Sequence, residues 1–117
     1  MSVSVLVVDD DPAFRGLARR MLIAAGLGIA GEAGTVATAT AAALDLRPDA
    51  ALVDIGLPDG DGIALARELA ALPWRPRIIL TSTDADAASA ADVRGSGAKR
   101  FVPKSQLPAM SLEVLLA

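Results

Sequence analysis

Aspartates in this sequence stand where apolar segments end. The first β-branched run stops at Asp9 and Asp10, and the run that begins at Ala50 stops at Asp54. The chain has no histidine and no cysteine, so these carboxylates together would form a hard oxygen site. Such a site suits Mg²⁺, which takes one or two carboxylates, several waters and a phosphate oxygen.

A cation and hydroxyl groups are available to complete such a site. Thr81 and Ser82 follow another apolar run, and Lys104 follows a short one near the end of the sequence. A carboxylate can attack a phosphoryl group in line, while a metal ion and an ammonium group neutralise charge on the equatorial oxygens. Asp54 is therefore a candidate phosphoacceptor, with an aspartyl phosphate as the product.

Alternating strands and helices are expected to bring these residues together. Short β-branched runs alternate with segments of helical apolar spacing. This alternation favours a parallel sheet covered by helices on both faces, and ligands bind at the carboxyl ends of the strands in such sheets. Strands are predicted at 3–8, 29–33, 50–53, 77–80 and 101–102.

Helices are predicted from apolar spacing and from their caps. Asp11 precedes a proline, which is the pattern of a helix cap and not of a metal ligand, and Asp61 is expected to cap a later helix. The alanine-rich segment 84–93 predicts a weaker helix, and a final helix is expected within 108–117 with Met110, Val114 and Leu115 facing inward. The other helices are expected to begin near Pro12, Val36 and Ile63.

Two segments resemble the motifs of one family. Leu6-Val-Val-Asp-Asp-Asp-Pro resembles the acidic cluster, and Val53-Asp-Ile-Gly-Leu-Pro-Asp-Gly the phosphoacceptor loop, of response regulator receiver domains, the phosphoacceptor modules of two-component signalling. The resemblance extends over essentially the whole chain. It implies an α/β, flavodoxin-like, doubly wound, five-stranded parallel sheet in the order 2-1-3-4-5 with helices on both faces. We expect a single receiver domain over residues 1–117, with no output domain.

The resemblance assigns roles to the acidic residues. Asp54 is the expected phosphoacceptor. Asp9, Asp10, Asp54 and the Gly56 carbonyl are the expected ligands of Mg²⁺, the implied cofactor. For Asp9 the alternative is a solvated carboxylate at the end of a strand.

A second group of residues is expected to respond to the phosphoryl group. The resemblance implies that Thr81, Ser82 and Lys104 contact this group, and that Phe101 is an aromatic switch that moves together with Thr81. The alternatives are a turn hydroxyl for Thr81, a solvated lysine for Lys104 and a core side chain for Phe101. The core role and the switch role of Phe101 are compatible.

The sequence departs from the family around the lysine and around the acceptor. Receiver domains usually have proline directly after the lysine, but here Pro103 precedes Lys104 and Ser105 follows. A cis bond before Ser105 would cost about 3 kcal/mol, so we expect a differently built loop. Gly56 and Thr83 stand where the family's side chains influence water, and neither carries a carboxylate or an amide, which predicts a long-lived phosphorylated state.

The composition limits which partners and which cellular location are expected. The formal net charge of -3 and the pI near 4.7 argue against a nucleic-acid surface. The first residues form neither a signal peptide nor a membrane span, and the lack of cysteine agrees with the cytoplasm. The resemblance implies a histidine kinase or phosphotransfer protein as donor, an unidentified downstream target and a phosphorylation-dependent homodimer.

Two other functions compete with the phosphorylated switch. One is a degenerate receiver that binds partners without phosphorylation. The other is a haloacid-dehalogenase-like phosphohydrolase, because Asp9 and Asp11 after a first strand resemble that family, but it needs further acids after its lysine and only Glu113 follows Lys104. We therefore predict no enzyme activity beyond self-phosphorylation from a donor and slow self-dephosphorylation.

Overall fold

Five parallel strands form one sheet in the computed structural model, which describes residues 3–116. The sheet has the order β2-β1-β3-β6-β7, and every neighbouring pair is parallel. The predicted order 2-1-3-4-5 is confirmed, with β6 and β7 as the fourth and fifth strands. The strands are β1 (Ser4–Val8), β2 (Gly28–Ala33), β3 (Ala50–Asp54), β6 (Arg77–Ser82) and β7 (Arg100–Pro103).

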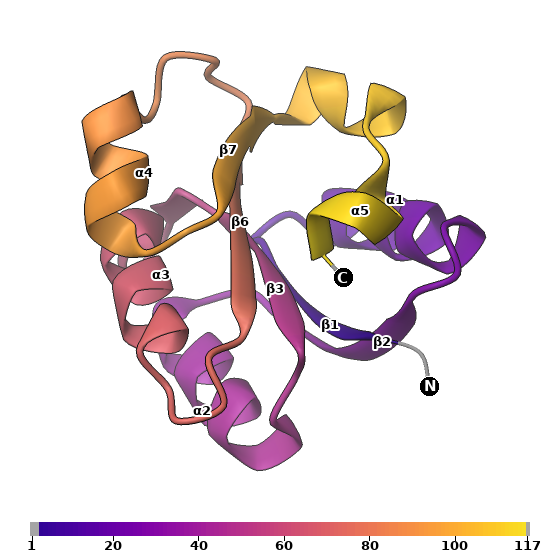
Figure 1. Cartoon of the computed structure of the whole chain (residues 1–117), viewed down its shortest axis with the longest axis horizontal. Coiled ribbons are helices and arrows are strands. Elements are labelled where there is room, and N and C mark those ends of the chain that lie inside the picture. The colour runs from indigo at the N-terminus through magenta and orange to yellow at the C-terminus, as the bar shows by residue number, and fades with distance from the viewer. Residues whose placement is uncertain (1–2, 117) are drawn as a thin grey trace.

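Helices cover both faces of the sheet, as Figure 1 shows. One face carries α1 (Pro12–Ala24) and α5 (Leu112–Leu116). The other face carries α2 (Val36–Leu46), α3 (Gly62–Ala70) and α4 (Ala90–Ser96). Within residues 3–116, no helix is long and apolar enough to cross a membrane.

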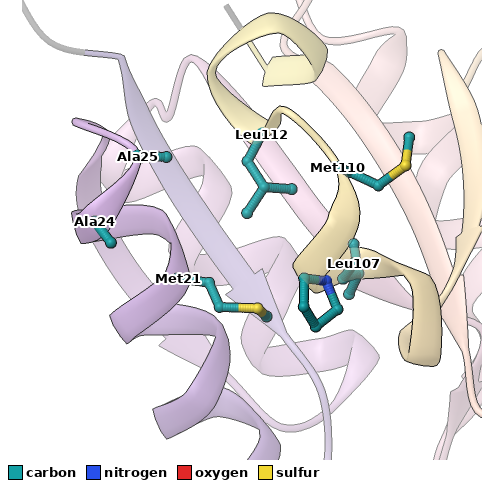
Figure 2. Close-up of a pocket in the computed structure, with 7 residues that line it drawn as sticks. Met21, Ala24, Ala25, Leu107, Met110 and Leu112 are labelled. Atoms are coloured by element: carbon teal, nitrogen blue, oxygen red, sulfur yellow. The ribbon is translucent and has the colours of Figure 1, made fainter.

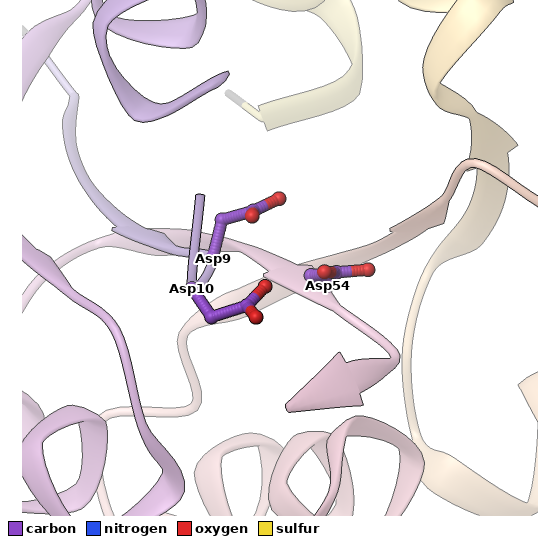
Figure 3. Close-up of side chains that lie close together, drawn as sticks. All are labelled: Asp9, Asp10 and Asp54. Atoms are coloured by element: carbon purple, nitrogen blue, oxygen red, sulfur yellow. The ribbon is translucent and has the colours of Figure 1, made fainter. Parts of the chain in front are cut away.

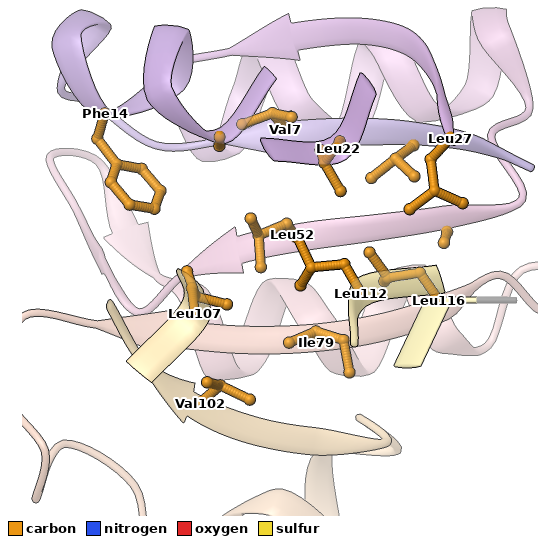
Figure 4. Close-up of a cluster of buried hydrophobic side chains, with 13 residues drawn as sticks. Val7, Phe14, Leu22, Leu27, Leu52, Ile79, Val102, Leu107, Leu112 and Leu116 are labelled. Carbon is orange, nitrogen blue, oxygen red and sulfur yellow. The ribbon is translucent and has the colours of Figure 1, made fainter. Parts of the chain in front are cut away.

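The central strands are apolar on both sides because both sides are covered. Val5 and Val7 of β1 belong to the core under α1 and α5, whereas Leu6 and Val8 belong to the core under α2 and α3. This alternation follows from the two-residue period of a strand. In Figure 4 the first of these cores includes Phe14 from α1, with other apolar side chains from the strands and from α5.

A hollow of about 300 Å³ lies beside this core, between α1 and the residues that precede α5. Met21, Leu107, Met110 and Leu112 are among the side chains that line it (Figure 2). The side chains of the lining are apolar, so the hollow offers no side-chain acid, base or charge for catalysis.

The predicted helix caps are present. The Asp11 carboxylate accepts a hydrogen bond of 2.9 Å from the backbone N–H of Ala13, one residue after the proline that begins α1. The Asp61 carboxylate accepts one of 2.9 Å from Ile63 at the start of α3. Asp11 is therefore occupied as a cap, as the sequence predicted.

The helix predicted over 84–93 is wrong in its first half. The helix α4 begins at Ala90, where Ser89 and Asp92 form a capping box. Before it, the Asp84 N–H donates to Ser82 Oγ and the Asp84 carboxylate accepts from the Asp86 N–H. Such bonds from side chains to the local backbone compete with helix formation, so this stretch forms turns.

The C-terminal helix differs from the prediction as well. A 3-10 segment, η1 (Lys104–Ala109), precedes a short α5 that begins at Leu112. Met110 and Leu115 pack against the core as predicted, but Val114 is 68% exposed, and Leu112 and Leu116 are buried in its place. The shorter helix changes which residues face the sheet.

Trp74 lies near the amino ends of the strands, at the opposite end of the sheet from the candidate functional residues. Its indole Nε1 donates a 2.9 Å hydrogen bond to the Pro48 carbonyl, and the Arg47 guanidinium lies 4.2 Å from the ring centroid. Because Pro48 comes just before β3, this contact lies near the amino end of the strand whose carboxyl end carries Asp54.

Candidate functional site

Three carboxylates meet at the carboxyl edge of the sheet. One carboxylate oxygen from each of Asp9, Asp10 and Asp54 lies within 4.8 Å of the other two (Figure 3). Asp9 and Asp10 follow β1, and Asp54 ends the neighbouring strand β3, so the parallel pairing of the two strands brings them together. Asp9 is fully buried, Asp54 is 6% exposed, and Asp10 is exposed.

Asp9 is held by two hydrogen bonds and one ion pair. Its backbone N–H donates to the Ala33 carbonyl at 2.9 Å, and its Oδ1 accepts from the Asp11 N–H at 2.9 Å. Its buried Oδ2 accepts no hydrogen bond from the described residues but forms an ion pair with the Lys104 ammonium, 2.7 Å away. The alternative of a solvated carboxylate does not hold for this residue, because its exposed fraction is 0%.

Lys104 reaches the acidic cluster from the start of η1. Its Nζ lies 3.7 Å from Asp54 Oδ2 and 4.2 Å from the centroid of the Phe14 ring. Its side chain is 14% exposed, so the alternative of a solvated lysine is not what the structure shows. All peptide bonds among the described residues are trans, including the one before Ser105, so the loop is built without the cis bond common in the family.

The environment of Asp54 disfavours its charged form. Burial raises the pKa of the Asp54 carboxyl, and the negative charge of Asp9 raises it further. The Lys104 ammonium and the Gly56 N–H, which donates to Asp54 Oδ1 at 3.4 Å, oppose this rise. Three carboxylates facing one ammonium leave an excess of negative charge, and their hard oxygen donors fit a divalent cation such as Mg²⁺.

Thr81 lies beside Asp54 on the neighbouring strand, where the two residues are register partners. Its hydroxyl is buried and donates a 2.7 Å hydrogen bond to the Val102 carbonyl on β7. Ser82 is also buried, and its Oγ accepts the Asp84 N–H. Both hydroxyls are therefore engaged away from Asp54 in this structure.

Phe101 is half-buried and packs against the core under α2 and α3. It also lines a hollow of about 390 Å³ together with Val93 of α4 and the basic residues Arg94 and Arg100. The core role is therefore present, and the ring has open space on its outer side.

The loop after Asp54 contains residues whose roles the sequence did not reveal. Asp59 accepts hydrogen bonds of 2.7 and 3.1 Å from Val36 and Ala37, the first two residues of α2, and these bonds lower the pKa of its carboxyl. Gly62 lies against the backbone of Asp54 so closely that a Cβ would overlap it. The loop pairs β4 (Gly56–Leu57) with β5 (Gly60–Asp61) as a short hairpin.

The matching family model is that of the response regulator receiver domain, and it covers residues 5–115. The chain belongs to this family. The receiver domain is 41% identical over 104 residues to the DNA-binding transcriptional activator DevR/DosR of Mycobacterium tuberculosis, a match that spans 87% of this chain and 48% of that protein. It thus spans about half of that relative.

Other relatives agree with this assignment. The receiver domain is 30% identical over 115 residues to the chemotaxis protein CheY of Thermotoga maritima, covering 98% of this chain and 96% of that protein. The crystal structure of a LuxR-family two-component response regulator from Aurantimonas superposes with a TM-score of 0.85 at 26% identity, covering 97% of this chain and 81% of that one.

Family membership removes one of the alternative functions that the sequence left open. The acidic pocket of Asp9, Asp10 and Asp54 in a receiver domain is consistent with a phosphorylation-activated switch and not with a hydrolase. The family also implies a histidine kinase as the source of the phosphoryl group. The haloacid-dehalogenase alternative is therefore set aside.

Proposed function

We propose that this receiver domain accepts a phosphoryl group on Asp54 from a histidine kinase or a phosphotransfer protein. The observation that carries the proposal is the position of the Asp54 carboxylate, inside a cluster of three carboxylates and 3.7 Å from the Lys104 ammonium. In the step, an Asp54 oxygen forms a bond to phosphorus while the bond between phosphorus and the donor nitrogen breaks. The donor imidazole keeps the electron pair of that bond.

Asp9, Asp10, Asp54 and the Gly56 carbonyl are the proposed ligands of Mg²⁺. When bound, the ion supplies positive charge to the phosphoryl oxygens. The raised pKa of Asp54 and the excess of carboxylates over ammonium groups support a site that gains from a divalent cation. Lys104 would leave Asp9 and approach the new phosphoryl group, which carries a larger negative charge.

We propose that the output begins at Thr81. To bond to the phosphoryl group, its hydroxyl has to release the Val102 carbonyl, which is the neighbour of Phe101 in β7. This coupling would move Phe101 inward and reshape the surface of β7 and the helices beside it. The phosphoryl contact of Ser82, the downstream target, a homodimer, the single-domain organisation over residues 1–117 and the cytoplasmic location stay predictions.

Intact-mass spectrometry tests the proposal. The purified protein is incubated with Mg²⁺ and either acetyl phosphate or a phosphohistidine donor, beside Asp54→Asn and a control without Mg²⁺. A phosphate-sized gain in the wild type alone, dependent on Mg²⁺, is expected. No gain from either donor would contradict the proposal and favour the phosphorylation-independent receiver.

The same measurement tests the predicted long life of the phosphorylated state. Gly56 has no side chain to orient water, and because it is exposed and a Cβ there would meet no atom within 4 Å, a larger residue fits at this position. Gly56→Asn should shorten the lifetime severalfold, whereas Gly95→Asn, at an equally open position on α4, should not. A wild-type half-life of seconds would contradict the prediction.

A further inference from the structure

The Arg15 guanidinium ties the acidic edge of the sheet to the edge strand β2. From α1, its Nη1 donates a 2.6 Å hydrogen bond to the backbone carbonyl of Asp9. Its Nε donates to Glu32 Oε1 at 3.2 Å, and the Arg15 side chain is 22% exposed. One planar cation therefore spans from β2 to the end of β1.

The bond to the Asp9 carbonyl has a direct effect on Asp10. This carbonyl belongs to the peptide group that links the two residues, and a peptide group is planar. Fixing the carbonyl therefore fixes the plane from which the Asp10 Cα departs. Across residues 3–116, the exposed Asp10 carboxylate makes no hydrogen bond or ion pair, so its position depends on the backbone that carries it.

Gly34 leaves room for the Arg15 guanidinium beside the backbone of Asp9 and Asp10. A Cβ on Gly34 would lie 3.3 Å from Arg15 Nη1 and 3.9 Å from the Asp10 Cα. Glycine at this position therefore lets the guanidinium approach the backbone of the acidic residues. Glu32 is held in turn by Arg19, whose Nη1 lies 3.6 Å from Glu32 Oε2.

We propose that Arg15, which is not one of the clustered carboxylates, is a positioning residue for the cation site. It acts by orienting the peptide that carries Asp10, and it does not itself bind the ion. The inference rests on the proposed function, because it names what prepares the same site. Residues that orient metal ligands in this way change metal affinity about 10–100-fold when they are lost.

Charge and position predict opposite effects, which makes the proposal testable. Removing a positive charge near the cluster strengthens the binding of a cation, whereas losing the orientation of Asp10 weakens it. Arg19 provides the matched control, because it is on the same helix and bonds to the same Glu32 but does not reach Asp9. Its side chain is 51% exposed, so its charge is screened by solvent.

Isothermal titration calorimetry with Mg²⁺ alone, on the full chain, compares wild type with Arg15→Gln, Arg15→Lys and Arg19→Gln. We expect about tenfold weaker binding for Arg15→Gln. Arg15→Lys should also bind more weakly than wild type, because an ammonium keeps the charge but cannot bridge Glu32 and the Asp9 carbonyl as a planar fork does. Arg19→Gln should stay within about twofold of wild type.

Phosphorylation by acetyl phosphate gives a second measurement. If Arg15 acts through the cation site, saturating Mg²⁺ restores the wild-type rate of Arg15→Gln, whereas a general loss of structure is not restored. Equal Mg²⁺ affinity in Arg15→Gln and Arg19→Gln, or wild-type affinity in the folded Arg15→Lys variant, would overturn the inference. A wild type that binds Mg²⁺ but takes no phosphate would instead overturn the proposed function and leave the affinity comparison valid.

Discussion

The two sides of Asp54 are built differently. On the β1 side, buried Asp9 is hydrogen-bonded through its backbone N–H and its Oδ1, and its Oδ2 forms an ion pair with Lys104 at 2.7 Å. On the β6 side, Thr81 donates a single 2.7 Å hydrogen bond to β7, and the neighbouring Ser82 is engaged in a turn. The first side holds paired charges, whereas on the second side the hydroxyl of Thr81 makes one hydrogen bond between neighbouring strands.

The elements beyond each side repeat this difference. Beyond β1 lies α1, with thirteen residues, a proline at its start and a capped N-terminus. Beyond β6 lies the turn stretch 84–89 and then α4, with only seven residues. Phe101 stands half-buried beside a hollow of about 390 Å³ on this second side. The helix that follows β6 is therefore shorter than the helix that follows β1, and turns separate it from its strand.

The largest effect is expected from Lys104→Met, which tests the ion pair on the β1 side of Asp54. Without the ammonium, Asp9 Oδ2 is left as a buried charge, and removing one partner of such a pair costs about 3–5 kcal/mol. The free energy of unfolding, measured by urea denaturation and circular dichroism, checks this. Mg²⁺ should recover part of the loss by replacing the positive charge.

The other lysine of the chain is the matched control for this variant. Lys99 is exposed, so Lys99→Met should change the free energy of unfolding by less than about 0.5 kcal/mol. An equal, small effect of both variants would show that the buried pair does not support the fold.

A smaller effect is expected from Thr81→Val, which tests the hydrogen bond on the β6 side of Asp54. The substitution keeps the shape but removes the hydroxyl, which leaves the Val102 carbonyl without this donor and costs about 1–3 kcal/mol. Thr83→Val is the control, because Thr83 is exposed. Hydrogen exchange should become faster in β7 and stay unchanged in β1, and faster exchange in β1 would contradict the separation of the two sides.

The smallest effect is expected from Asp54→Asn and depends on pH. The pKa of Asp54 is raised above its ordinary value of 3.8, so the folded state binds this proton more tightly than the unfolded state. The charged carboxylate therefore lowers stability at neutral pH, and the wild type regains this stability as the pH falls through the raised pKa. Asp54→Asn should melt a few degrees higher than wild type at pH 7.

The difference in melting temperature should shrink on acidification and vanish below the ordinary pKa. Asp86→Asn, at an exposed position, should show no such gap. A melting temperature of Asp54→Asn below that of the wild type at neutral pH would contradict the assignment of Asp54 as a carboxyl group whose charged form is destabilised by burial and by Asp9.

Much of the fold could be predicted because its signals are local. The β-branched runs and the caps Asp11 and Asp61 depend on neighbouring residues, and they appear as predicted. The first half of the 84–93 helix failed because alanine content does not show that Ser82 and Asp84 bind the local backbone instead. Val114 failed because a five-residue helix has too little sequence to fix its phase.

The site was predictable as a set of side chains but not as a network. The ends of parallel strands meet at one edge, which is why Asp9, Asp10 and Asp54 could be grouped from the sequence. That Lys104 pairs more closely with Asp9 than with Asp54 depends on distances that only the folded chain defines. Arg15 gave no signal, because its acceptor is a backbone carbonyl and every residue has one.

The indole contact at the far edge of the sheet has a consequence for spectroscopy. Trp74 is the single tryptophan of the chain and there is no tyrosine, so the near-ultraviolet emission of the protein comes almost entirely from this one ring. The ring is bonded to Pro48 and stacked under Arg47, at the end of β3 remote from Asp54. Its fluorescence therefore serves as an internal reference for the folded scaffold, against which a probe attached near α4 can be compared.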